Sequence, residues 1–375
     1  MENLAHTLFG LALAKAGLER TTPLATTALV ISSNLPDIDT VVRVRGVTAY
    51  LEHHRGLTHS LLGLAVLAGV LAFLLAYLDR KFRLRGDPFR RPVRPARLFA
   101  VSLVGGLGHL FMDFTNTYGV RPLLPFSRRW YYGDLAFVVD PWLWLILGAA
   151  AVWLTTSAAA RSNSRVALRA VFWIVVAALA SLTVALASPN TNVAETKMPT
   201  ALRLLWFAGL AVIIVGAVLG WGRAGARLAR YSLVLLALYY GGLWIAHQTA
   251  QEKAGDDLPT ETGGVRAAWP TPANPAYWQA VAADNEFFYT RFLRLNGSAD
   301  SWREMLRPDP ALVEELRQWE QGRVFLDFAR YAAVTEEKLS EDRHRVLFRD
   351  LRFPLQMSVE LDADRHVKSV AVRWF

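Results

Sequence analysis

One apolar run restricts the fold of this chain more than any other feature. Residues 60–78 are 19 consecutive uncharged, mostly apolar residues. As an α-helix this run extends about 28 Å at 1.5 Å per residue, which is enough to cross a bilayer core of about 30 Å. The sequence therefore predicts an integral membrane protein.

Further apolar segments indicate a polytopic protein. Hydrophobic residues make up 53% of the 375 residues, which is typical of a very apolar part joined to an ordinary one. Two early segments, 4–17 and 24–35, are short and predict a helical hairpin that either spans thinly or re-enters the membrane. After residue 78 we expect helices at 98–118, 135–155, 166–188, 201–220 and 231–248. The fold class is therefore mainly α, with about seven to eight apolar segments.

The distribution of positive charge predicts how the chain is oriented. The net charge is +9, and residues 79–97 alone carry eight Lys or Arg, which marks a cytoplasmic segment. Strict alternation then puts both termini and the loop 121–134 outside a cytoplasmic (inner) membrane. Because topology explains most of the excess arginine, the bilayer is the expected partner and nucleic acid is not. The chain has no cysteine, which excludes disulfides and thiolate metal ligands.

The composition changes after residue 248, where a linker rich in Gly and Pro begins. Alternating patterns then predict strands at 287–292, 323–328, 346–348 and 367–374. Residues 310–318 are expected to form a helix capped by Asp309. We therefore expect a membrane core over 1–145, additional helices over 146–248, and a soluble extracytoplasmic α+β domain over 249–375. This last domain is either a cap over a site or an interaction module.

Polar residues with metal-binding side chains concentrate in the first 113 residues. Under the topology above they converge near the outer face, and ionisable groups in membranes usually pair or bind something. His109 and Asp113 are spaced i, i+4, so both leave one helical face. The residues are His6, Asp37, Asp39, His53, His54, His59, His109 and Asp113.

Carboxylate and imidazole ligands without sulfur suit Zn²⁺, Mn²⁺ or Fe²⁺ better than Ca²⁺ or Mg²⁺. The seven or so candidate ligands are more than one tetrahedral ion can bind. They suit two ions bridged by the carboxylate of Asp37 or Asp113. Each residue taken singly has a plainer explanation. The His109–Asp113 spacing occurs by chance, the paired aspartates can be helix-end charges, and His59 can be interfacial. Because all of these residues lie at about the same depth in the predicted membrane, near its outer face, we favour a single metal site.

Three motifs in order resemble a known family. Residues 33–39 (SNLPDID), 54–60 (HRGLTHS) and 108–113 (GHLFMD) look like the YdjM-like, LexA-regulated, membrane-bound metal-dependent hydrolases. The resemblance covers about residues 1–145. A weaker similarity connects these motifs to zinc-dependent phospholipase C and zinc single-strand nucleases. Those enzymes bind three zinc ions and use an HxxxE pair, which the membrane core here lacks, so neither three metals nor a phospholipid substrate is implied.

The resemblance implies a set of site residues. Asp39 is either a ligand or a group that orients one, and His53 lies outside the motif as a solvated neighbour. Arg55 and Arg129 are expected to clamp an anionic phosphate, although Arg129 can equally anchor to lipid headgroups beside an aromatic belt. The implied metal ligands are His6, Asp37, His54, His59, His109 and Asp113.

The function that follows is an integral membrane hydrolase with one or two divalent ions, zinc first, facing outside. It is expected to cleave a phosphate ester, or another ester or amide, of a lipid or envelope molecule. The nucleophile is metal-bound hydroxide, with either Asp39 or a free histidine as a candidate proton shuttle. The alternative is a non-catalytic membrane protein that binds or senses a metal ion through the same cluster. Nearly uncharged segments after Asp140 argue against a transport path across the membrane.

Overall fold

The computed structural model describes residues 2–82, 92–158, 163–186, 199–258, 266–297, 299–340 and 343–374. Residues 83–91 of the basic segment 79–97 and residues 189–198 of the expected outer loop lie outside these residues. The chain divides into two compact units. The first comprises 1–38, 57–246 and 270–275, and the second comprises 39–56, 247–269 and 276–375.

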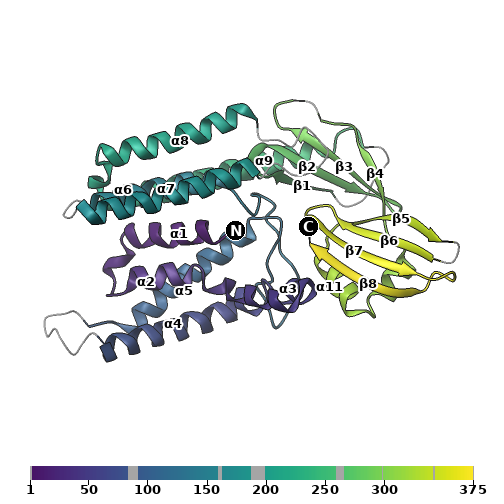
Figure 1. Ribbon diagram of the computed structural model, residues 1–375, viewed down its shortest axis with the longest axis horizontal. Helices are drawn as coiled ribbons and strands as arrows, with labels where there is room; N and C mark the ends of the chain where they lie inside the picture. Colours follow the sequence, from purple (N-terminus) through teal and green to yellow (C-terminus); the bar gives the residue numbers. More distant parts are fainter. Residues whose placement is uncertain are drawn as a thin grey trace. The chain divides into compact units, whose positions relative to one another are not determined.

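The first unit is helical (Figure 1). Its N-terminal half consists of α1 (Asn3–Lys15), α2 (Ala25–Ser32), α4 (Leu61–Phe82) and α5 (Pro95–Phe114). The pair α1 and α2 forms the predicted hairpin, and α5 packs against α1, α2 and α4. Its C-terminal half consists of α6 (Pro141–Ala158), α7 (Asn163–Leu186), α8 (Thr200–Val218) and α9 (Ala226–Lys253), the last of which ends in the second unit.

Four helices in the described part of the chain are long and apolar enough to cross a membrane, namely α4, α5, α8 and α9. Two shorter apolar stretches lie in α6 and α7. The expected number of seven to eight spanning segments is therefore not confirmed. At 13 and 8 residues, α1 and α2 extend only about 20 Å and 12 Å, so neither spans a bilayer core as a straight helix.

One helix starts later than expected. The apolar segment 135–155 becomes helical only at Pro141, the first residue of α6. Proline suits a first helical position because its missing N–H needs no partner there. The Asp140 carboxylate accepts the Trp142 N–H at 2.9 Å and caps the helix. Residues 135 and 136 instead donate their N–H groups to the Thr115 carbonyl.

Small residues allow α1, α2 and α5 to approach closely. A Cβ added at Gly10 of α1 would lie 2.7 Å from Ser33 Oγ and 2.8 Å from Leu29 O. A Cβ added at Gly105 of α5 would overlap Ser32 Oγ. The buried residues Ala14, Ala28 and Leu98 fill the space beside these contacts. This close packing brings polar residues at the ends of the three helices together.

The second unit contains an eight-stranded sheet in the order β1 to β8 (Figure 1). The register of the pairs from β2 to β8 is antiparallel. The strands are β1 (Arg266–Thr271), β2 (Asn274–Ala283), β3 (Phe287–Arg294), β4 (Arg303–Leu306), β5 (Ala332–Ser340), β6 (Arg343–Asp350), β7 (Leu355–Leu361) and β8 (Val367–Trp374). The expected antiparallel sheet is therefore present.

Short helices accompany the sheet. Helix α10 (Pro310–Leu316) begins after Asp309, whose side chain accepts the Ala311 N–H as predicted. The expected strand over 323–328 is wrong, since Glu320–Phe328 forms α11. Val324, Phe325 and Phe328 are buried there, and the spacing i, i+1, i+4 places them on one helical face. Helix α3 (Val47–His53) packs against α11 in the same unit.

Because α1 and α2 approach closely at Gly10, we expect one added methyl group at this position to destabilise the protein. Gly10→Ala forces its Cβ against backbone and side-chain atoms and should lower the free energy of unfolding by about 1–3 kcal/mol. The matched control is Gly69→Ala in α4, where an added Cβ meets nothing within 4 Å. Thermal unfolding in mild detergent should show a lower Tm for Gly10→Ala alone. Equal Tm values for the two variants would contradict the packing.

Candidate metal centre

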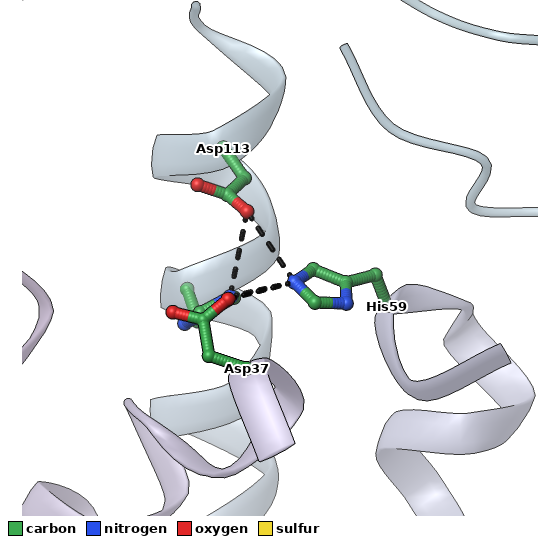
Figure 2. Close-up of side chains that lie close together, drawn as sticks. Asp37, His59 and Asp113 are labelled. Carbon is green, nitrogen blue, oxygen red and sulfur yellow. Dashed lines mark hydrogen bonds and ion pairs between the residues drawn. The ribbon is translucent and has the colours of Figure 1, made fainter. Parts of the chain in front are cut away.

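Four side chains of the first unit converge on a small volume. One ligand atom from each of Asp37, His59, His109 and Asp113 lies within 4.8 Å of those of the others. His59 Nε2 lies 3.3 Å from Asp37 Oδ1, 3.4 Å from Asp113 Oδ2 and 3.1 Å from His109 Nε2. His109 Nε2 lies 3.7 Å from Asp37 Oδ1 and 3.5 Å from Asp113 Oδ2. Figure 2 shows the Asp37, His59 and Asp113 side chains pointing toward one another.

These separations fit a metal ion. Four tetrahedral donors at 2.0–2.1 Å from Zn²⁺ are about 3.4 Å apart from one another. The observed separations of 3.1–3.7 Å scatter about that value. Two carboxylates and two imidazoles are also a donor set that Zn²⁺, Mn²⁺ and Fe²⁺ accept. The residues present therefore fit a divalent ion in both geometry and chemistry.

Local structure explains how distant residues meet. His109 and Asp113 leave one face of α5, and both side chains are completely buried. His59 ends the short 3₁₀ helix η3 (Leu57–His59), directly before α4. Asp37 lies in the first turn of η2 (Leu35–Arg45), a 3₁₀ segment that follows α2. Three separate elements thus supply the four donors.

Hydrogen bonds orient the two imidazoles. His109 Nδ1 lies 2.8 Å from the Ser33 carbonyl oxygen, which can only accept. His109 must therefore donate from Nδ1, so its Nε2 lone pair faces the cluster. His59 Nδ1 lies 3.0 Å from Thr58 Oγ1, which can accept a hydrogen bond and favour the same tautomer. Partners of this kind fix ring orientation in metal sites.

His6 joins the cluster from α1. Its ring is completely buried and stacks on His109, with ring centroids 3.8 Å apart. His6 Nε2 lies 3.4 Å from Asp113 Oδ1, while the other Asp113 oxygen faces His59 and His109. His6 Nδ1 has no hydrogen-bond partner among the described residues. Asp113 therefore has the arrangement of a carboxylate that can bridge two ions.

Asp37 is charged at neutral pH. Burial raises the pKa of its carboxyl, but the interactions with His59 and His109 outweigh burial and hold the pKa at about 2. A carboxylate with so low a pKa is ready to bind a cation without first losing a proton. With Asp113 it brings two carboxylate groups to the centre, and carboxylate oxygens are ligands of divalent ions.

The other predicted site residues lie in the second unit or at the surface. Asp39 Oδ1 lies 2.8 Å from His54 Nδ1, and Asp39 Oδ2 accepts the Arg55 N–H at 3.0 Å. Arg55 is buried and adopts a positive φ of 54°. The Arg129 guanidinium is exposed and lies 5.4 Å from the Tyr131 ring centroid.

The sequence did not show which groups some of these polar side chains contact. The Ser33 carbonyl belongs to the backbone, although Ser33 opens the first motif. The Thr58 side chain contacts the neighbouring His59 ring. The Asp140 carboxylate accepts the Tyr239 hydroxyl at 2.8 Å. The His53 side chain is 55% exposed, as expected for a solvated neighbour.

Together the fold and this cluster define a class, a membrane protein with a buried carboxylate–imidazole centre that can hold a metal ion. The chain belongs to the YdjM inner membrane protein family, whose sequence profile matches residues 1–191. The resemblance inferred from the three motifs is thereby confirmed.

A curated relative matches the chain over a shorter length. The protein named "Uncharacterized protein YfhP", from Bacillus subtilis (strain 168), is 30% identical to this chain over 127 residues. The match covers 34% of this chain and 36% of that relative. No solved structure matches the chain.

A bound ion should stabilise the fold. Zn²⁺ at 100 times its Kd adds about 2.7 kcal/mol, which raises Tm by on the order of 5 °C. We expect the Zn²⁺-loaded protein to lose this increment when EDTA is added. Asp113→Asn should show no EDTA effect, whereas His53→Ala should behave as the wild type. A wild-type Tm that does not respond to EDTA would contradict the centre.

Thr58 should tune affinity without being a ligand. Thr58→Val removes the hydroxyl beside His59 and should weaken Zn²⁺ binding about 10- to 100-fold. Thr58→Ser keeps the hydroxyl and should restore most of the affinity. Competition with a chromophoric chelator measures both values. Equal affinities in Thr58→Val and the wild type would show that Thr58 does not orient His59.

Proposed function

We propose that this protein is a membrane-embedded, metal-dependent hydrolase. The observation that carries the proposal is that the Nε2 atoms of His59 and His109 lie 3.1–3.7 Å from each other and from the carboxylate oxygens of Asp37 and Asp113. His6 is proposed as a further ligand on the opposite side of the Asp113 carboxylate. One ion fits the four-residue cluster, and a second ion would use Asp113 as a bridge. Zinc is the first candidate, with manganese and iron as alternatives.

A divalent ion here supplies a Lewis acid and lowers the pKa of water toward neutrality. The chain's own residues set the conditions for that chemistry. Asp37 and Asp113 provide negative charge, and Ser33 and Thr58 orient the two imidazoles. Complete burial of His59, His109 and Asp113 keeps bulk water away and strengthens each electrostatic interaction.

The Asp39–His54 pair is proposed to take part in the reaction. A carboxylate held against Nδ1 raises the basicity of an imidazole and fixes its orientation. His54 is then suited either to bind a metal ion or to move a proton through Nε2, with Asp39 as its partner. Asp39 also accepts the Arg55 N–H, which ties the pair to the middle motif.

The proposed substrate is a phosphate ester of a lipid or envelope molecule. Arg55 and Arg129 are proposed to bind its anionic part, because guanidinium groups pair with phosphate oxygens. Arg129 follows Arg128 in a loop that also presents Phe126, whose side chain is 86% exposed. Basic and aromatic groups of this kind suit the headgroup level of a bilayer. The basic segment 79–97 supports placing the centre and the C-terminal domain on the outer side.

Metal content and hydrolysis test the proposal together. The full chain purified in mild detergent should contain one or two equivalents of a transition metal by elemental analysis. It should hydrolyse bis-p-nitrophenyl phosphate, and both properties should fall at least tenfold in His59→Ala and Asp113→Ala. His53→Ala is the control, since its side chain is exposed. Unchanged metal content in both variants would refute the ligand set.

The number of protein ligands in the cluster supports a second candidate function. Four protein ligands can complete a tetrahedron, which is typical of structural zinc sites, whereas catalytic sites keep a position open. A non-catalytic protein that binds or senses a metal ion would suit such a closed set. Stoichiometric metal with no hydrolysis of phosphodiester, phosphomonoester, carboxylic ester or amide probes would favour this function over the hydrolase.

A further inference from the structure

A separate cavity lies among α1, α6, α7 and α8 of the first unit. Its volume is about 350 Å³, and its walls include Leu8, Gly148, Ala177, Leu210, Ile213 and Ala217. Figure 1 shows α6, α7 and α8 running side by side. Of these, α8 is long and apolar enough to cross a membrane, and α6 and α7 contain shorter apolar stretches. The cavity is therefore bounded by membrane-type helices.

Small residues leave this space open. Gly148, Ala177 and Ala217 come from three different helices and all face the cavity. A Cβ built at Gly148 meets no atom closer than Leu8 Cδ1 at 3.9 Å. In a close-packed interior an empty space of this size is costly. A group that filled this space would therefore regain the missing packing contacts.

The polar atoms of the walls are already paired. Trp144 Nε1 donates to Glu2, Trp173 Nε1 donates to Thr155 Oγ1 at 2.9 Å, and Trp206 Nε1 donates to Ser181 Oγ at 3.1 Å. The Thr156 hydroxyl donates to the Val152 carbonyl at 2.7 Å. A buried water needs two to four polar partners, so the cavity offers water little to bind. The apolar walls suit hydrocarbon.

We propose that this cavity binds one acyl chain of a membrane phospholipid. An apolar cavity of about 150 Å³ accepts benzene, and on that scale about 350 Å³ accepts a chain segment of roughly 12–14 carbons. Phospholipid chains are the hydrocarbon that surrounds α8 in a bilayer. The proposal does not depend on the metal centre or on hydrolysis.

Photocrosslinking tests the proposal directly. The full chain is reconstituted in phosphatidylethanolamine vesicles that contain phosphatidylglycerol with a diazirine in its acyl chain. We expect adducts on cavity-facing residues such as Leu8, Leu210 and Ile213, in addition to lipid-facing residues such as Phe73, whose side chain is 72% exposed. Adducts confined to lipid-facing positions in the wild type would overturn the proposal.

Variants that fill the cavity sharpen the test. Gly148→Phe places a ring in the space and should reduce the cavity adducts at least fivefold, with the Phe73 adduct unchanged. Gly241→Phe is the matched control, because a Cβ there meets nothing within 4 Å and Gly241 does not line the cavity. Ala217→Phe fills the space from another wall and serves if Gly148→Phe fails size-exclusion or circular-dichroism checks. Undiminished cavity adducts in a folded filling variant would overturn the proposal.

Discussion

The burial of two carboxylates among imidazoles, inside an otherwise apolar helical unit, is the constraint on which the rest of this structure depends. Asp113 is completely buried, and Asp37 lies beside it in the same cluster. Buried charges cost several kcal/mol each unless they are paired or bind a metal ion. His6, His59 and His109 are the side chains that contact these two carboxylates. A divalent ion bound there would offset this electrostatic cost and make the polar cluster compatible with the apolar fold.

Helix α1 connects this centre to the rest of the unit. His6 points to the metal centre, while Leu4 and Leu8, two residues away on either side, line the apolar cavity. Glu2 caps the helix by accepting the Leu4 and Ala5 N–H groups and also accepts the Trp144 indole N–H. The same 13-residue helix therefore supports a polar site on one side and a hydrocarbon-lined space on the other. Its closeness to α2 depends on Gly10.

Local patterns in the sequence predicted the parts of the site that depend on local geometry. The i, i+4 spacing of His109 and Asp113 and the capping role of Asp309 need only helix geometry. That Asp37 and His59 lie close to His109 and Asp113 was predicted by comparing how far each residue lies from the outer membrane face. The Ser33 carbonyl could not be predicted, because a backbone acceptor has no side-chain signature. The helix over 320–328 was missed because a short apolar run fits both the helical and the strand periodicity. In the folded protein the burial of Phe325 and Phe328 favours the helix.

X-ray absorption spectroscopy of the Zn²⁺-loaded full chain would identify the metal ligands directly. We expect nitrogen and oxygen ligands at about 2.0–2.1 Å from the ion, with outer-shell scattering from at least two imidazoles. In His109→Ala the imidazole scattering should decrease while the oxygen contribution remains. A shell of oxygen alone, without imidazole scattering, would show that the metal binds elsewhere and would contradict the centre formed by Asp37, His59, His109 and Asp113.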